Sequence, residues 1–289
     1  MPNVTARRRL RDGIEAARAG GAPVVGPLTL DPLTARLAEE LGYGAGYLSG
    51  GALGYQLAVS EALLTITELA DTCRRMTVRS SLPIVVDGGV GFGDAVHVQR
   101  AMWEFEAAGA AAIELEDQVA PKRVSHHRGV EHLVPVEEMA DKIAAAVEAR
   151  SDPGFLVIAR TGAVRHEGFE AALGRLERYR EAGADLLLLF PSTEEEWAAA
   201  PQRLGAPLVA MVSVEAVAGL PAGWPLVVDP ITGQVLAYRA VRDAYRRYRA
   251  EGTSGHPIKE LMSVYRELAP MAGLEPLYDL ERRTTEPGT

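Results

Sequence analysis

Eight short apolar runs recur along this chain, and they constrain its fold more than any other feature. They begin at positions 23, 46, 83, 111, 155, 185, 207 and 225, and they are rich in β-branched residues. Runs of this length and composition are typical of parallel strands that are buried on both faces. The sequence therefore predicts an α/β fold with a parallel sheet at its centre.

Stretches with helical spacing separate most of these runs. They begin at positions 33, 66, 95, 136, 169, 194 and 234. Gly42, Gly109 and Gly183 stand just before the next apolar run, where the C-cap of a helix is expected. An apolar run and the stretch that follows it thus make one strand–helix unit.

Two architectures fit this alternation, an open doubly wound sheet and a closed barrel. An open sheet that binds a dinucleotide would carry a G-x-G-x-x-G turn after its first strand, but the sequence there is GPLTLDP. Eight is the number of units that closes into a (β/α)8 barrel of the TIM type. We therefore expect such a barrel, in a single domain that spans residues 1–289.

Two segments follow the last predicted unit. Residues 256–272 form a predicted extra helix with an apolar stripe. An apolar helix outside a closed barrel needs a partner surface. Residues 281–289 are polar, charged and contain proline, and they are predicted to form a disordered tail.

The chain is acidic, with a formal net charge of −9 and a pI of about 5.3. Such a chain lacks the positive surface that nucleic acids and anionic membranes select, so neither is expected as a partner. No apolar run approaches the roughly 20 residues of a membrane span, and no secretory signal is evident. The single cysteine, Cys73, excludes an intramolecular disulfide, and we expect a cytoplasmic protein.

Carboxylates stand at the ends of two neighbouring predicted strands, where barrels of this type carry their active sites. Asp87 ends the third run, and Glu114 and Glu116 end the fourth. Because Glu114 and Glu116 lie two residues apart on a strand, they point to one face, and if that face is the barrel interior they converge with Asp87. Their counter-charge is either a divalent cation, Mg²⁺ or Mn²⁺, or an internal network with Arg160, Lys122 and Arg123.

Two other strand ends carry groups that suit anions. The turn Ser49-Gly50-Gly51 offers backbone N–H groups that could cradle a carboxylate or phosphate, although an ordinary tight turn has the same composition. Arg160 suits a bidentate contact with a substrate carboxylate, and an ion pair with Glu116 is the alternative.

A long polar segment, residues 117–135, lies between the fourth run and the next helix. Loops of this length often act as active-site lids. The segment carries two adjacent histidines, His126 and His127, which would serve either as acid–base or ligand groups or simply as solvated side chains.

Four motifs occur in the order and spacing of one enzyme superfamily. They are GYLSGG from position 46, LPIVVDGGVGFGD from 82, AAIELEDQVAPKR from 111 and VIARTGA from 157. Over about residues 9–253 the chain resembles the isocitrate lyase and phosphoenolpyruvate mutase superfamily, and most of all its short methylisocitrate lyase and oxaloacetate-cleaving branch.

The resemblance implies a barrel whose last helix is swapped between subunits, in a homodimer or homotetramer. It also implies Mg²⁺, or Mn²⁺, and a bound 2-oxo acid or enolpyruvate unit. The implied reaction makes or cleaves a C–C or P–C bond beside the carbonyl.

The superfamily's substrate-binding positions are present in this chain. Its substrate-carboxylate turn is matched by Tyr47, Ser49, Gly50 and Gly51. Its substrate-binding arginine is matched by Arg160.

Metal-binding and lid positions are matched in part. Asp87 matches the first Asp of the metal-binding D-x-D motif, and Glu116 matches the glutamate of the metal shell. Lys122, Arg123 and His126 match the basic part of the K-R-C-G-H lid.

Departures from the family pattern change the expected chemistry. Gly89 replaces the second Asp of D-x-D, and Val124, followed by Ser125, replaces the lid cysteine that serves the lyases as acid. Glu114 and Glu61 replace a His and an Asp, and either could compensate in the metal shell. Because Val124 cannot donate a proton, the chain is not expected to be a standard isocitrate or methylisocitrate lyase.

The leading hypothesis is a lyase that acts on a small 2-oxo or 2-hydroxy carboxylic acid through an enolate-like intermediate, by C–C cleavage or decarboxylation. Proton transfer would then fall to Glu114, Ser125 or His126, and Arg160 would hold the substrate. Two alternatives stay open. One is a metal-independent enzyme of a specialised pathway on the same fold, and the other is a non-catalytic homologue that binds a metabolite.

Overall fold

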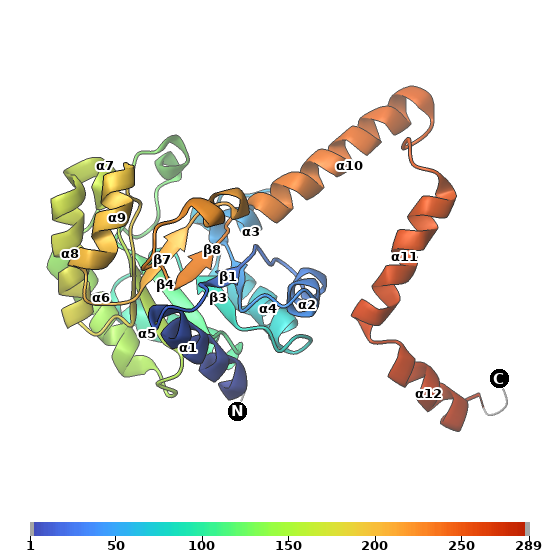
Figure 1. The fold of residues 1–289 in the computed structure, drawn as a ribbon, viewed down its shortest axis with the longest axis horizontal. Helices are drawn as coiled ribbons and strands as arrows, with labels where there is room; N and C mark the ends of the chain where they lie inside the picture. The colour runs from blue at the N-terminus through green and yellow to red at the C-terminus, as the bar shows by residue number, and fades with distance from the viewer. Residues whose placement is uncertain (1–2, 287–289) are drawn as a thin grey trace. The chain divides into compact units, whose positions relative to one another are not determined.

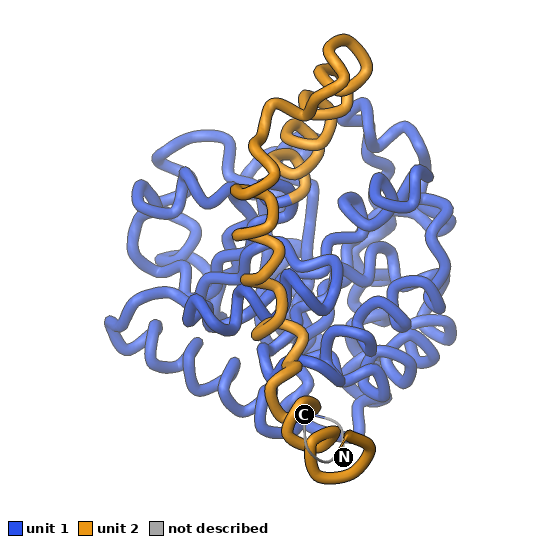
Figure 2. The backbone as a smooth tube through the Cα atoms, turned by 90° about the vertical axis from the view of Figure 1, so that its right-hand side faces the viewer, with its two compact units in different colours: residues 1–233 blue, residues 234–289 orange. Residues whose placement is uncertain are grey.

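The computed structural model describes residues 3–286. The chain divides between Gly233 and Gln234 into two compact units (Figures 1 and 2). The first unit contains all eight predicted strands. The second contains three helices, the first of which begins at the end of the first unit. The expectation of one domain over residues 1–289 stays a prediction.

The first unit is built around eight parallel strands in the order β1-β8-β7-β6-β5-β4-β3-β2. Every strand falls within one of the apolar runs: β1 Val24–Gly26, β2 Gly46–Leu48, β3 Ile84–Asp87, β4 Ala112–Glu116, β5 Leu156–Arg160, β6 Leu186–Leu188, β7 Leu208–Met211 and β8 Leu226–Val228. The predicted (β/α)8 TIM-type barrel is therefore confirmed.

The ring of strands closes between β1 and β2. The backbone N–H of Thr29 donates to the carbonyl of Tyr47 over 2.8 Å, and the N–H of Tyr47 donates to the carbonyl of Pro27 over 2.9 Å. Leu28 and Tyr47 form the corresponding parallel bridge. Closure gives the strands one common carboxyl end, at which side chains from different strands meet.

Helices surround the ring, and those at residues 32–40, 66–77, 95–107, 136–149, 169–181 and 194–203 lie where the helical spacing predicts them. The helices of the first unit are α1 Val4–Arg18, α2 Pro32–Glu40, α3 Gly50–Gln56, α4 Ile66–Thr77, α5 Ala95–Ala107, α6 Val136–Ala149, α7 Ala163–Glu167, α8 Phe169–Glu181 and α9 Glu194–Arg203. Their starts are determined locally, because the side chains of Asp31, Thr65 and Asp94 accept hydrogen bonds from first-turn N–H groups of α2, α4 and α5. Three 3₁₀ helices complete the unit: η1 Glu61–Leu63, η2 Val124–Arg128 and η3 Val214–Gly219.

The segment between β7 and β8 departs from the strict alternation of strand and helix. It holds the 3₁₀ helix η3 in place of an α-helix. Gly219 ends η3, and Pro221 and Gly223 follow before the next strand. Glycine and proline at this spacing stop a helix from growing.

Apolar side chains form one layer inside the barrel and one outside it. The inner cluster contains Tyr47, Val85, Ile158, Leu188, Val209 and Val228. Leu10 and Ile14 of α1 belong to the same cluster, so α1 covers the inner layer at one end of the barrel. The outer cluster lies between the strands and the surrounding helices. Charged groups are therefore left to the opposite rim.

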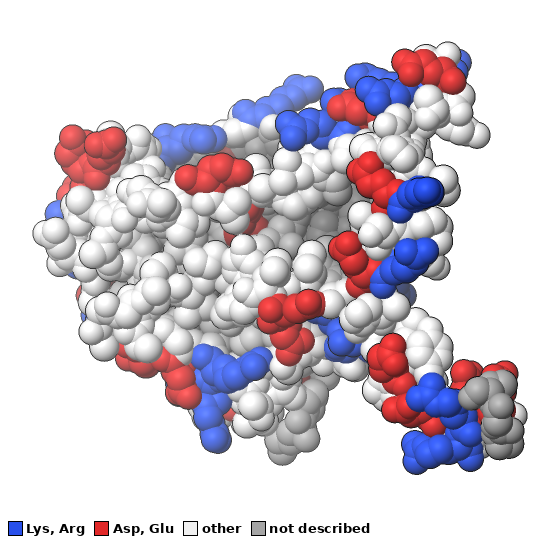
Figure 3. Space-filling model, turned by 45° about the vertical axis from the view of Figure 1, so that its right-hand side comes forward, with Lys and Arg blue, Asp and Glu red and all other residues white. Residues whose placement is uncertain are grey.

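The second unit consists of α10 Thr232–Glu251, α11 Ile258–Ala272 and α12 Glu275–Thr284. No described residue of these helices is buried, and α11 exposes the predicted stripe of Ile258, Leu261, Met262 and Tyr265. Figure 3 shows acidic and basic side chains alternating with uncharged ones along these helices. Within the described residues, no helix has both the length and the apolarity that crossing a membrane requires.

The predicted disordered tail differs from the structure at its start. Residues 281–284 belong to α12, and the last three residues, 287–289, lie outside the described part of the chain. The helical segment was missed because only Leu277, Tyr278 and Leu280 carry its apolar face among many charges. Pro276 in its first turn is a helix-start signal.

Candidate active site

Four neighbouring strands bring polar side chains together at their carboxyl ends. Tyr47 lies on β2, Asp87 on β3, Glu114 and Glu116 on β4, and Arg160 on β5. The strand register pairs Asp87 with Glu114 and Glu116 with Arg160. The convergence expected from the two-residue spacing of the glutamates is thus present, and the two glutamates and Asp87 are all buried.

Arg160 joins both glutamates of β4. Its Nη1 lies 2.7 Å from Oε1 of Glu114, and its Nη2 lies 3.2 Å from Oε2 of Glu116. The guanidinium also stacks over the ring of Phe190, at 4.9 Å from the ring centroid. Burial alone would lower the pKa of Arg160, but the charges of Glu116 and Glu114 outweigh burial and hold this pKa above its usual value. The arginine is a fixed positive charge.

Glu114 is a buried carboxyl group whose surroundings favour protonation. The hydroxyl of Tyr47 donates to its Oε2 over 3.1 Å, from the inner layer of the barrel. Burial raises the pKa of Glu114 to about 7, because the attraction of Arg160 only partly opposes burial and Asp87 adds repulsion. A carboxyl group with this pKa can both give and accept a proton near neutral pH.

Lys122 links the lid to the barrel. Its Nζ lies 2.6 Å from Oε1 of Glu116 and forms an even shorter ion pair with Oε1 of Glu61. His126 Nε2 lies 2.9 Å from the same oxygen of Glu61. Burial would raise the pKa of Glu61, but the hydrogen bond to His126 and the charge of Lys122 hold this pKa well below its ordinary value. Glu61 is thus the ionised anchor of the lid.

Asp87 is held by two backbone donors. The N–H of Gly50 lies 3.1 Å from Oδ2, and the N–H of Gly89 lies 2.9 Å from Oδ1. Burial raises the pKa of Asp87 in spite of the opposing charge of Lys122. A Cβ at Gly51 would come within 2.7 Å of Oε2 of Glu61, so a glycine here lets that carboxylate approach the turn. The predicted anion turn therefore serves carboxylates of the protein itself.

The remaining predicted residues lie away from the carboxylates or make other contacts. Ser49 accepts the N–H of Ala52 and caps α3. Ser125 donates to the carbonyl of Val130 inside the lid, and the side chains of Arg123 and Val124 are exposed. His127 lies 2.8 Å from Oγ of Ser60 and does not join His126 on Glu61. The lid thus closes onto the segment around η1.

A polar network behind the site was missed by the sequence analysis. Oδ2 of Asp117 accepts hydrogen bonds from Thr161 at 2.6 Å and from Tyr179 at 2.9 Å, and Arg175 lies 3.4 Å away. Asp117 and Thr161 directly follow Glu116 and Arg160, so the network braces the ends of β4 and β5. The buried tyrosine and arginine on α8 gave no sequence signal, because helical spacing alone places them on no particular partner.

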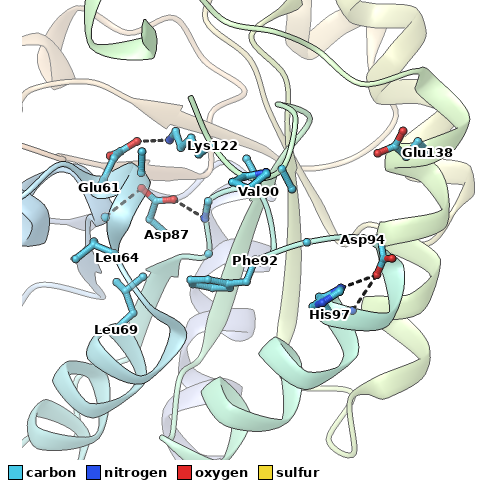
Figure 4. A pocket seen from close by; sticks show the side chains of 17 residues that line it. Glu61, Leu64, Leu69, Asp87, Val90, Phe92, Asp94, His97, Lys122 and Glu138 are labelled. Carbon is cyan, nitrogen blue, oxygen red and sulfur yellow. Dashed lines mark hydrogen bonds and ion pairs between the residues drawn. The ribbon is translucent and has the colours of Figure 1, made fainter. Parts of the chain in front are cut away.

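A cavity of about 520 Å³ opens beside Asp87 (Figure 4). Glu61, Lys122 and Gly50 line its polar end together with Asp87. It continues away from them along an apolar wall that contains Leu64, Leu69, Val90 and Phe92. Reactants can therefore reach Asp87 without displacing the barrel core.

The carboxylates at this rim are the side chains that could hold a divalent cation. Among the described residues, no group of three or more His, Cys, Asp and Glu side chains is arranged to hold a metal ion. The cluster nevertheless has four carboxylates, Glu61, Asp87, Glu114 and Glu116, against two fixed cations, Lys122 and Arg160. Mg²⁺ often takes only one or two protein carboxylates and fills its other positions with water and substrate. Asp87 and Glu116 fit that demand.

The phosphoenolpyruvate phosphomutase family model matches residues 15–246. The chain belongs to this family. It is 36% identical over 274 residues to the 2-methylisocitrate lyase of Aeropyrum pernix, covering 91% of this chain and 86% of the relative. The 2,3-dimethylmalate lyase of Eubacterium barkeri is 33% identical over 273 residues, covering 89% and 92%.

A solved structure shares the fold over almost the whole chain. It is a phosphonopyruvate hydrolase in complex with oxalate and Mg²⁺, with a TM-score of 0.82 and 30% identity over 97% of this chain and 99% of that one. The resemblance expected from the four strand-end motifs is therefore confirmed. The roles of single residues are not tested by these comparisons and stay proposals.

Proposed function

We propose that this chain is a carbon–carbon lyase that acts on a small 2-oxo or 2-hydroxy carboxylic acid through an enolate-like intermediate. The observation that carries the proposal is the joint placement of Arg160, Lys122, Asp87 and Glu116 at the mouth of the barrel, beside a cavity. The similarity to lyases of methylisocitrate and dimethylmalate supports the reaction class.

Lys122 and Arg160 bind and orient the substrate in this proposal. Both are fixed cations that lie next to the reacting space, and their pairing with Glu116 sets their positions before substrate arrives. Preorganised charges of this kind stabilise the negative charge that develops on an enolate. Closure of the lid through Lys122 and Glu61 excludes water from that charge.

Asp87 and Glu116 would hold Mg²⁺, or Mn²⁺, at the same rim. When bound, such an ion polarises the substrate carbonyl and neutralises part of the enolate charge. Gly89 offers no side chain for the ion, so water or substrate would fill the position that the family's second Asp occupies.

Glu114 transfers the proton to the enolate carbon in this proposal. Its pKa of about 7 leaves a large protonated fraction at neutral pH. Of the other two predicted donors, Ser125 is bonded within the lid and His126 is engaged with Glu61. The exposed Val124 supplies no lid acid, which favours decarboxylation or a cleavage that is protonated from the barrel side.

The test is turnover and binding with the intact protein. We expect decarboxylation of oxaloacetate to pyruvate, measured by release of CO₂, and no turnover of methylisocitrate. Isothermal titration should show oxalate binding that strengthens with Mg²⁺. Absence of both oxalate binding and turnover of every 2-oxo and 2-hydroxy acid would refute the proposal. Full activity after exhaustive chelation would leave the proposed lyase reaction standing but refute the proposed metal ion.

A homodimer or homotetramer in the cytoplasm is part of the same proposal. The apolar stripe of α11 is exposed, and covering it with the barrel of a second copy, by a swapped helix, would bury it. Light scattering should give a multiple of the mass of 30.9 kDa. Replacing Leu261 and Tyr265 with Glu should yield monomers, and monomers already in the wild-type protein would contradict this part.

A further inference from the structure

The cavity beside Asp87 is larger than a three- or four-carbon acid requires. Its volume of about 520 Å³ lies in the range of roughly 300–1,000 Å³ in which proteins enclose drug-sized ligands. Lys122 is the lining side chain that would bind a carboxylate, and it lies at one end of the cavity, beside Glu61 and Asp87. The remaining space is available to another part of a substrate.

The middle of the cavity is apolar. Leu64 and Leu69 line one side, Val90 and Phe92 lie between the two polar ends in Figure 4, and Pro121 adds a further apolar surface. Leu64, Leu69 and Val90 are each less than a tenth exposed, so they are held in place by the fold. A wall of this kind binds alkyl or aryl groups through burial of apolar area.

The loop after β3 keeps this space open because it has no side chain at Gly89. A Cβ at this position would meet no atom within 4 Å, although Gly89 lines the cavity. Its φ of +53° is one that other residues rarely adopt. Gly89, which stands where the family pattern has an Asp of the metal shell, thus also leaves room for substrate.

The far end of the cavity is bordered by Asp94, His97 and Glu138 (Figure 4). Asp94 already pairs with His97, whose Nδ1 lies 2.7 Å from its Oδ1. Glu138 adds a second carboxylate on the same side. An anionic group would be repelled here, whereas a neutral end or a hydrogen-bond donor would be accepted.

We infer that the substrate carries an extended apolar substituent that lies along Leu64, Leu69 and Phe92, with its carboxylate end at Lys122. The chemical class is a 2-oxo or 2-hydroxy acid with an alkyl or aryl branch of several carbons and no anion at the branch end. This inference rests on the proposed function, which it deepens by naming the substrate class.

The first experiment measures binding without turnover. Pyruvate, 2-oxobutyrate, 2-oxohexanoate and 2-oxooctanoate compete with oxalate on the wild-type protein, by isothermal titration in the presence of Mg²⁺. Each added CH₂ should tighten binding about twofold to fourfold until the cavity is filled. Affinity that is flat or falls with chain length would overturn the inference, whether or not the protein turns over oxaloacetate.

The second experiment uses two neighbouring leucines. Leu64→Trp fills the cavity, whereas Leu63→Trp is the matched control, because Leu63 is 68% exposed and does not line it. Leu64→Trp should weaken 2-oxooctanoate at least tenfold and leave pyruvate and oxalate within about twofold, and Leu63→Trp should change neither. Equal loss for short and long acids in Leu64→Trp, or none, would contradict the inference. If Leu64→Trp fails to show a cooperative melting transition, Leu64→Phe takes its place with the same expectations.

Discussion

The two halves of the barrel mouth carry carboxylates in different surroundings. On the side of β2–β5, Glu114 and Glu116 face charged side chains and a cavity opens beside Asp87. On the side of β6–β8, Asp229 is equally buried but accepts the backbone N–H groups of Val214, Ile231 and Thr232, at 3.1, 2.9 and 2.9 Å. A strand-end carboxylate is therefore no sign of catalysis by itself, because its partners decide whether it holds a loop or handles a substrate.

Of the substitutions in the two halves of the barrel mouth, replacement of Arg160 should have the largest effect. Arg160→Met leaves Glu114 and Glu116 buried without their shared cation, and removing one partner of a buried ion pair costs about 3–5 kcal/mol. Activity should fall by at least about a thousandfold, since the same residue binds substrate. Urea unfolding and kcat/KM measure the two effects. A variant that keeps both wild-type stability and activity would contradict the central role of Arg160.

Replacement of Glu114 separates its role in proton transfer from its role in packing. Glu114→Gln keeps the size of the side chain but removes the proton, so kcat should fall about 10²- to 10³-fold. The wild-type kcat should decline as the pH rises through about 7, where the acid form is lost, and the variant should lack this limb. Stopped-flow or steady-state pH profiles provide the measurement. An unchanged limb in Glu114→Gln would assign the proton to another group.

The raised pKa of Glu114 should also make the stability of the protein depend on pH. The pKa of Glu114 is raised in the folded state, so its ionisation disfavours folding. Its contribution is fully favourable below its ordinary pKa of 4.5 and is lost as the pH rises to about 7. Glu114→Gln should therefore gain stability relative to wild type above pH 7 and not at pH 4. Equal differences at both pH values would argue against the raised pKa.

Replacement of Asp229 should lower stability but leave activity almost unchanged, unlike replacement of the glutamates. Asp229→Ala leaves three backbone N–H groups without their acceptor and should lower the unfolding free energy by about 1–3 kcal/mol. The activity per folded molecule should stay within about twofold, because Asp229 touches none of the reacting groups. Thermal denaturation and active-site titration separate the two quantities. A large loss of kcat in the fully folded variant would show that Asp229 belongs to the same functional site as the glutamates.

The smallest effect is expected at the lid. The hydrogen bond to Glu61 raises the pKa of His126, so this ion pair is complete below the ordinary value of 6.5 and weakens as the pH rises through the raised pKa. Limited proteolysis within residues 120–130 should become a few times faster at pH 9 than at pH 6. His126→Gln should remove most of this pH dependence, whereas His127→Gln, which lacks the Glu61 contact, should keep it.

Sequence patterns were sufficient for the barrel and for its charged rim. Strand positions follow from apolar runs that can be buried only between layers, and Glu114 and Glu116 share a face because side chains alternate along a strand. The family was recognisable because motifs at strand ends keep their order and spacing even where single residues such as Gly89 and Val124 have changed. These are properties of local spacing, which one chain displays directly.

Only the tertiary structure decided which partners these residues have. The N–H of Gly50 donates to Asp87, Lys122 bridges Glu61 and Glu116, and Asp229 accepts backbone N–H groups. The sequence indicates none of these pairings. The cavity beside Asp87 and the pKa of Glu114 also depend on distances between segments far apart in the chain. Burial and Coulomb interactions act through space, so local patterns identify the charges but not the pairs they form.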